Sequence, residues 1–303
     1  MNRNTFNKSV VPGLFAFMVS GYKPKNSESL WRKLCTVRSS KRAYEENAYF
    51  STLGTIPAKP EGTAITYDEF VQGPTKRWTA KTYGLGVKVS EELIEDALYP
   101  DIPTKMEQIT KELGSSARET QELLVHDLIN NYANYTAGDG VVIFNGSHTS
   151  LRGGTWSNIL SPAADLTATS LQTAIDNFET TKDDSGKYQI IKVRYLIVAP
   201  QNAWKAKELL NSTYDPESAN NAVNTIKDRN LSLIVSPYLT DTDAWTLMAE
   251  PPSSSSGIIA FERRAVTFAK DGDFETGDAK FKATFRFSVA VNRPDNLYHA
   301  AGA

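Results

Sequence analysis

One amphipathic pattern about 30 residues long constrains this chain more than any other feature. Its apolar positions recur at steps of three or four, with Thr120 in the one gap: Ile102, Met106, Ile109, Leu113, Ala117, Leu124, Leu128 and Tyr132. Charged side chains occupy the other face, so the pattern predicts one helix over about 102–132. Such a helix is ~45 Å long, too long for the interior of a compact domain. We expect an elongated molecule with this helix as its spine, not a coiled coil, because the spacing drifts from a strict heptad.

The segments before the helix predict a projecting finger. Ala64–Phe70 and Trp78–Ser90 alternate like strands, and the Gly-Pro pair within Val71–Arg77 predicts the turn between them. An isolated hairpin is marginally stable in water, so we expect this finger to lie on another subunit. Ser90 is suited to cap a short helix over Glu91–Leu98.

The remainder predicts a second, mixed α/β region. Loop-rich residues 132–162 precede it, and its elements are a helix through Leu171–Phe178, a buried strand at Arg194–Ala199, a helix from Pro200, an exposed loop at Asn211–Asn230, and strands at Leu231–Val235 and Trp245–Ala249. After the flexible sequence Pro251–Gly257, a strand is expected over Gly257–Phe268. The strict alternation of Lys280–Asn292 predicts the clearest strand of the chain.

Charge is divided unevenly along the chain. Met1–Tyr44 contain nine basic residues and one acid, a net charge of +8, so the remainder carries −10 and the sum is −2. This polarity favours head-to-tail association, with a basic arm on an acidic neighbour; the alternative is a solvated, partly flexible N-terminus. The near-neutral total gives no general attraction to nucleic acid or to an anionic membrane.

Other features exclude several classes of protein. No apolar run reaches the ~18 residues that a membrane-spanning helix needs, and Pro12-Gly13 interrupt the one stretch, Val10–Val19, that resembles a signal sequence. The single Cys35 cannot form an internal disulfide, which fits a reducing compartment.

The chain contains no phosphate-binding loop, dinucleotide-binding glycine motif, serine-hydrolase elbow or metal-ligand spacing. We therefore expect no catalytic residue, cofactor or metal ion; a hydrolase using His148 with a nearby serine is the remaining enzyme hypothesis. The acidic cluster Asp271–Asp278 departs from a calcium loop at Thr276 and Lys282, and a hairpin turn is the preferred interpretation.

In this order, the elements resemble those of the major capsid proteins of tailed bacteriophages with the Hong Kong 97-like fold, in particular the Mu-like group. The segments that carry the resemblance are Val11-Pro12-Gly13-Leu14, Arg38-Ser39-Ser40 with Tyr44, Gly153–Asn158, Leu196–Pro200, Leu239–Trp245, Phe261–Arg264 and Asp271–Gly277. The resemblance implies an α+β fold divided into an N-terminal arm (1–48), an E-loop (49–90), a P-domain with the spine helix (91–165), an A-domain (166–250) and return strands that complete the P-domain (251–303).

The resemblance also implies a structural function. Copies of the chain would form hexamers and pentamers of an icosahedral head that encloses double-stranded DNA, assembled in the bacterial cytoplasm. The implied partners are a portal protein, possible decoration proteins and a separately encoded scaffolding protein. The scaffolding protein is expected because the chain begins directly with the arm, without the charged helical prefix of self-scaffolding members; the alternative is a processed mature form of a longer precursor. An encapsulin-like compartment is the alternative. The residues expected at subunit interfaces are Arg38, Arg42, Lys76, Arg77, Trp78, Tyr214, Asp215, Asp271 and Asp273.

Overall fold

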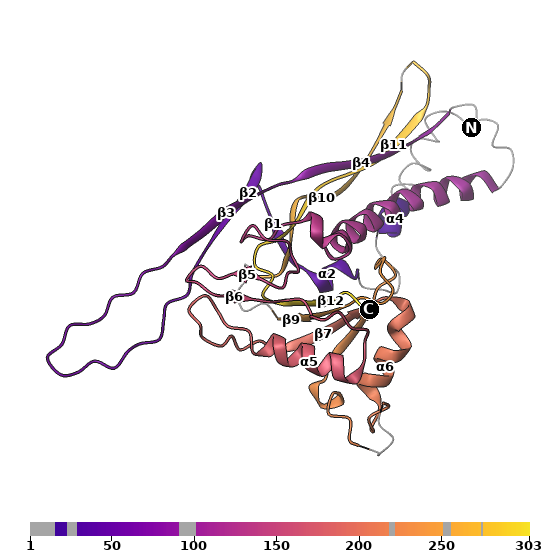
Figure 1. The fold of residues 1–303 in the computed structure, drawn as a ribbon. Helices are drawn as coiled ribbons and strands as arrows, with labels where there is room; N and C mark the ends of the chain where they lie inside the picture. The colour runs from indigo at the N-terminus through magenta and orange to yellow at the C-terminus, as the bar shows by residue number, and fades with distance from the viewer. Residues whose placement is uncertain (1–15, 23–28, 91–100, 218–221, 251–255, 274) are drawn as a thin grey trace.

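The computed structural model describes residues 16–22, 29–90, 101–217, 222–250, 256–273 and 275–303, with side chains of the long helix from residue 107 onward. The molecule is elongated (Figure 1). A finger projects from one side of the body, and a β-hairpin and the long helix extend in a different direction. No helix in the described ranges is long and apolar enough to cross a membrane. The predicted helix at Glu91–Leu98 lies outside the described residues.

The first sheet has the order β1-β10-β11-β4. Its strands are β1 (Thr36–Ser39), β4 (Lys81–Val89), β10 (Ile258–Gly272) and β11 (Ala279–Val291). β1 runs parallel to β10, and the other pairs are antiparallel. The alternation predicted for Lys280–Asn292 is confirmed, because Phe281, Phe285 and Phe287 are buried on one face of β11.

The spine helix α4 (Asp101–Asn130) packs on the buried face of this sheet, within two residues of the predicted bounds. Its buried side chains only partly follow the apolar pattern. Leu113, Ala117 and Leu128 are buried, whereas Ile109 is 39% exposed. Polar Glu122 is buried instead, and its two carboxylate oxygens accept hydrogen bonds from the backbone N–H groups of Leu30 (2.9 Å) and Trp31 (2.8 Å) at the start of α2 (Trp31–Leu34).

The second sheet has the order β12-β9-β7-β8. It comprises β7 (Val193–Val198), β8 (Ser232–Val235), β9 (Trp245–Ala249) and β12 (Leu297–Ala300), and it packs with α5 (Ala168–Glu179) and α6 (Ala203–Asn211). The Thr167 and Ser170 side chains form a capping box at the start of α5. The C-terminal region from residue 256 therefore contributes to both sheets, because β10 and β11 lie in the first sheet and β12 lies in the second. Smaller elements are β5 (His148–Thr149), β6 (Thr155–Trp156) and the short 3-10 helices η1 (Tyr132–Asn134), η2 (Pro200–Asn202) and η3 (Lys227–Arg229).

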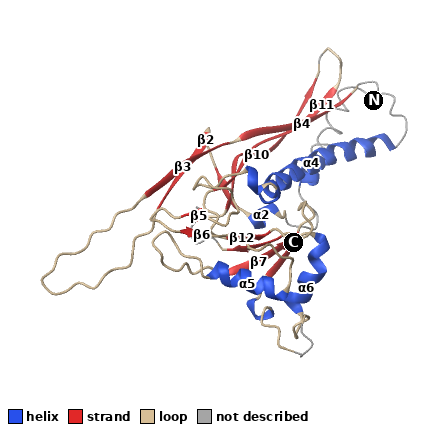
Figure 2. Ribbon diagram, viewed as in Figure 1, coloured by secondary structure: helices blue, strands red, loops and turns tan. Residues whose placement is uncertain are grey.

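The finger differs from its prediction. It consists of β2 (Tyr44–Phe50), residues 51–71 and β3 (Gln72–Thr79), drawn as a long loop beyond two strands in Figure 2. The prediction of a turn at Val71–Arg77 is wrong, since most of this segment is strand β3, and Ala64–Phe70 are not a strand. The predicted second strand is divided at Ala80, because β4 pairs with β11 rather than with the finger.

The described part of the N-terminal region lies on its own subunit rather than forming an extended arm. Trp31 is 1% exposed and its ring packs edge-on against Phe287, at 5.4 Å between ring centroids. Residues 16–22 form a short helix that crosses α4, and the two backbones come closest at Gly21 and Gly114. A Cβ at Gly114 would overlap the backbone oxygen of Met18, and a Cβ at Gly21 would overlap that of Lys111.

We expect Gly114→Ala to lower the free energy of unfolding by roughly 1–3 kcal/mol, because the added methyl group must separate the two backbones. In an exposed helix, the same substitution would stabilise by about 1 kcal/mol. Urea denaturation of the unassembled subunit measures the change, with Gln108→Ala on the exposed face of α4 as the control. An increase in stability for Gly114→Ala would contradict the close crossing.

Candidate subunit interfaces

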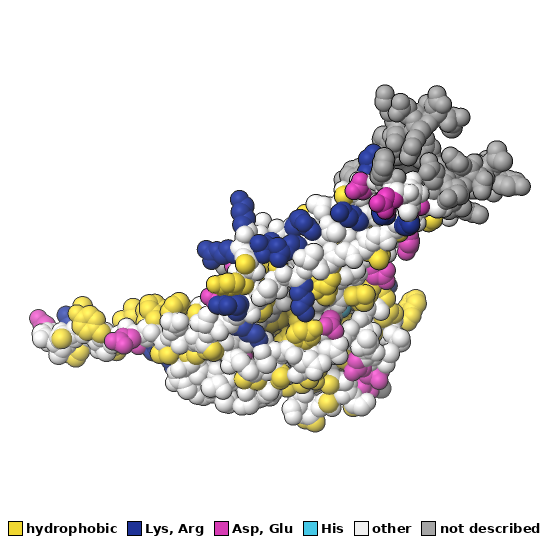
Figure 3. All heavy atoms as spheres, turned by 90° about the horizontal axis from the view of Figure 1, so that it is seen from above, with side chains coloured by type: hydrophobic (Ala, Val, Ile, Leu, Met, Phe, Trp, Pro, Cys, Tyr) yellow, Lys and Arg dark blue, Asp and Glu magenta, His cyan; other side chains and the backbone are white. Residues whose placement is uncertain are grey.

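The finger presents apolar side chains that its own subunit does not bury. Exposed large apolar residues in and beside the 51–71 loop are Phe50, Leu53, Ile56, Ile65, Tyr67, Phe70 and Val71. Ile56 is 97% exposed and Tyr67 is 90% exposed. In Figure 3 these apolar atoms follow the narrow projection away from the body. A group of exposed apolar side chains on a projection indicates an interaction site.

The predicted interface residues Lys76, Arg77 and Trp78 lie at the base of the finger, not at its tip. The Arg77 guanidinium pairs with the Glu46 carboxylate across β2 and β3, at 2.5 Å. Trp78 stacks on Phe261 of the first sheet, with 6.2 Å between the ring centroids. Trp78 therefore joins the finger to its own body, while the Arg77–Glu46 pair joins the two strands of the finger.

Lys76 connects β3 to the loop that follows α4. Its ammonium donates to the backbone oxygen and hydroxyl of Thr136 and to the backbone oxygen of Ala137. Partial burial lowers the pKa of this ammonium, because desolvation disfavours its charge, and Asp139 acts in the opposite direction. This contact holds the base of the finger to the loop that follows α4.

The first sheet has a basic outer face. Strand register places Arg38, Arg264, Arg286 and Lys282 on the face opposite the buried phenylalanines. Arg264 and Arg286 are direct cross-strand partners, an arrangement that repels within one subunit. Figure 3 shows Lys and Arg side chains gathered on the upper side of the molecule between the finger and the far end. Arg42 is exposed in the turn between β1 and β2.

The acidic cluster forms the predicted hairpin turn between β10 and β11. Asp273 pairs with Lys280 and Asp278 with Lys88, each at 2.5 Å. Hydrogen bonds from these two lysines lower the pKa of each carboxyl. Asp271 is exposed at the end of β10. Within the described ranges, no group of three or more His, Cys, Asp or Glu side chains is arranged to hold a metal ion.

Tyr214 and Asp215 lie in the loop after α6, within the segment predicted to be exposed, and the described part of this loop contains internal hydrogen bonds. Asp215 N donates to the backbone oxygen of Ala222 at 2.8 Å, and Asn224 is buried with its amide donating to the backbone oxygen of Leu209. The Tyr214 side chain remains exposed. These contacts close the base of the loop and leave Tyr214 available to another molecule.

The His148 ring contacts an aspartate, an asparagine and a tryptophan rather than the serine partner of the hydrolase hypothesis. Its Nδ1 lies 2.6 Å from Asp139 Oδ2, its Nε2 lies 3.0 Å from Asn158 Oδ1, and its ring stacks on Trp156. Asn158 Oδ1 also accepts from the backbone N–H of Asn145, which fixes the orientation of the amide. Both ring nitrogens therefore face acceptors, and the fully buried imidazole binds three segments of the loop region together.

His126 forms a group that superficially resembles a catalytic triad. Its Nδ1 donates to the backbone oxygen of Glu122 (2.7 Å), which leaves Nε2 to accept from the Ser236 hydroxyl (2.8 Å). His126 and Ser236 are both 0% exposed. Burial lowers the pKa of His126, which favours the neutral ring. Without access for a substrate, this group connects the spine helix to the end of β8.

Replacing His148 with Phe should destabilise the subunit by roughly 3 kcal/mol, because Asp139 and Asn158 lose their buried hydrogen-bond partner. Chemical denaturation monitored by tryptophan fluorescence measures the loss. Tyr188→Phe, at an exposed position in another loop, is the control. Wild-type stability of His148→Phe would contradict the structural role given to this ring.

Comparison with known proteins gives a consistent result. The sequence model of a family described as phage capsid protein matches residues 73–300. The capsid structure of the cyanophage P-SCSP1u has a TM-score of 0.62 and 12% identity, covering 93% of this chain and 90% of that chain. The mature capsid of bacteriophage PhiM1 has a TM-score of 0.57 and 13% identity, with 92% and 88% covered.

A holo-encapsulin complex from Synechococcus elongatus is also similar, with a TM-score of 0.55, 12% identity and 91% and 88% covered. At these identities the three structures show a shared fold and no more. No curated protein matches the chain.

Proposed function

The chain belongs to the phage capsid protein family and has the Hong Kong 97-like capsid fold, and we propose that its copies form hexamers and pentamers of an icosahedral head around double-stranded DNA. The protein is a structural capsid protein of the virion. Membership of the Mu-like group remains a prediction.

The exposed apolar surface of the finger is the observation that carries this proposal. Burying one large apolar side chain contributes roughly 2 kcal/mol, and the finger presents several of them to solvent. A neighbouring copy of the chain supplies the surface that covers them. Contacts of this kind, repeated around a closed shell, stabilise it without one strong site.

The domain assignment follows the resemblance and is adjusted to the observed elements. In the proposed assembly the E-loop is the finger, while β4 (Lys81–Val89) belongs to the sheet of the P-domain. The A-domain, residues 166–250, points toward the centre of the capsomer. Tyr214 and Asp215 would lie near the local axis, and Arg38, Arg42, Asp271 and Asp273 would contact neighbours at the periphery.

The proposed partners are further copies of the chain, a scaffolding protein, a portal protein, decoration proteins and packaged DNA, with assembly in the bacterial cytoplasm. DNA would be enclosed without recognition of its sequence, consistent with the near-neutral total charge of −2.

The double substitution Ile56→Ser/Tyr67→Ser should reduce the yield of closed shells at least tenfold, because it removes the apolar contact with the neighbour. The melting temperature of the unassembled subunit should stay unchanged, since both side chains are exposed. Negative-stain microscopy and sedimentation measure assembly, and Lys59→Gln on the same loop is the matched control. Normal shells from the double variant would remove the finger from the proposal.

The encapsulin alternative differs in what the particle contains. Particles purified from infected or induced cells, treated with nuclease and then opened, should release genome-length double-stranded DNA. Gel electrophoresis and mass spectrometry of the contents measure this outcome. A cargo enzyme in place of long DNA would favour the encapsulin-like compartment.

A further inference from the structure

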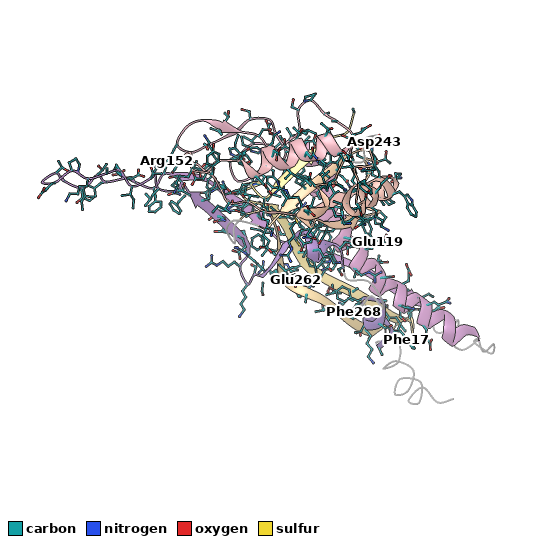
Figure 4. The ribbon with its side chains drawn as sticks, turned by 90° about the horizontal axis from the view of Figure 1, so that it is seen from below. Phe17, Glu119, Arg152, Asp243, Glu262 and Phe268 are labelled. Carbon is teal, nitrogen blue, oxygen red and sulfur yellow. The ribbon has the colours of Figure 1, made fainter. Side chains whose placement is uncertain are left out.

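Arg152, in the loop between β5 and β6, contacts both legs of the finger where it leaves the body (Figure 4). Its Nε donates to Ser51 Oγ at 3.1 Å on the first leg. One terminal nitrogen donates to Asp68 Oδ1 at 2.8 Å, and the other to the backbone oxygen of Glu69 on the second leg. The planar guanidinium thus forms a clamp across the root of the loop.

The acceptors of Arg152 also hold the two legs to each other. Asp68 Oδ2 accepts from the backbone N–H of Gly54 at 2.8 Å, and Ser51 Oγ accepts from the backbone N–H of Val71 at 2.9 Å. Arg152 therefore binds two legs that are already hydrogen-bonded to each other. A change in the position of the guanidinium would move both legs together.

Neighbouring contacts fix the first leg to the same part of the body. Thr52 Oγ1 donates to Asp183 Oδ2 at 2.7 Å. Nearer the body, the Arg293 guanidinium lies over the Tyr49 ring at 5.0 Å and pairs with buried Asp184 and Asp295. The finger is thus anchored to loops of the body at its root, while residues 55–67 extend beyond the clamp.

We propose that Arg152 is a positioning residue that sets the direction in which the finger leaves the body, and therefore where its apolar loop meets the neighbouring subunit. This inference rests on the assembly proposed above. The loop reaches ~25 Å beyond the clamp if it is nearly extended, so a rotation of ~10° at the root would move its end by about 4 Å. A displacement of this size separates side chains that pack in contact.

A purely stabilising role for Arg152 does not account for its position. The Arg152 side chain is 22% exposed and that of Asp68 is 41% exposed, and ion pairs with such access to water contribute little to folding. Arg152 links both legs of the finger to the loop between β5 and β6, so its main effect is on the orientation of the finger relative to the body and not on folding stability.

The test measures the orientation of the finger in the unassembled subunit separately from the assembly of shells. Spin labels on Cys residues introduced at Glu61 in the finger and Asp176 on α5, in a Cys35→Ser background, report their distance distribution in unassembled full-length subunits. Variants are Arg152→Glu, Asp68→Arg and the double exchange, with Arg194→Glu, which breaks the exposed pair with Glu250, as the matched control. Melting temperature and shell yield are measured on the same proteins without labels.

We expect each single exchange to shift or broaden the distance distribution and to reduce shell yield at least tenfold, with the melting temperature within a few degrees of wild type. The double exchange should restore both readouts only in part. It re-forms the ion pair with reversed polarity, but it does not re-form the hydrogen bonds of Arg152 to Ser51 and Glu69 or that of Gly54 to Asp68. The control should change neither readout.

An unchanged distance distribution in Arg152→Glu, an altered distribution with normal shells, or no recovery in the double exchange would overturn the inference. Failure of the unaltered protein to form shells would instead count against the proposed function, and the distance measurement would still decide the role of Arg152 in direction.

Discussion

The packing of β11 against the spine helix determines the rest of the structure. β11 lies between β10 and β4, and its buried aromatic side chains contact α4 and α2 in one continuous core. Because β4 follows β3 after the single residue Ala80, fixing β4 in this sheet also fixes the base of the finger. The projecting loop can therefore remain outside the core while its direction is defined by the core.

Buried polar side chains join the spine helix to the elements around it. The His126–Ser236 hydrogen bond joins the spine helix to the end of β8, and Glu122 holds the start of α2. Each of these groups has a partner, so its burial supports a defined geometry instead of leaving an unpaired polar atom. The body can then act as a unit, and the finger and loop surfaces are left to make contacts with other copies.

Much of the fold follows from local patterns. The spine helix, the alternating strand β11 and the succession of helices and strands along the chain between Ala168 and Ala249 were predicted because each depends on periodicity within a short segment. The finger was misassigned because residues 51–71 form no ladder, while the Gly-Pro segment predicted as a turn pairs with β2 (Tyr44–Phe50), more than 20 residues earlier. Sequence patterns also could not identify Arg152, whose partners Ser51 and Asp68 are 101 and 84 residues away along the chain.

The sequence by itself determined an elongated α+β chain with a long amphipathic helix, a basic N-terminal region and no motif for catalysis, because these depend on composition and on neighbours along the chain. Only the tertiary structure decided which residues are free to meet another subunit. It paired Arg77 with Glu46 inside the finger, placed Trp78 against Phe261 of the first sheet, and left Ile56 and Tyr67 exposed. The physical reason is that exposure depends on which distant segments pack together within one subunit, and the periodicity of a segment does not identify its distant partner.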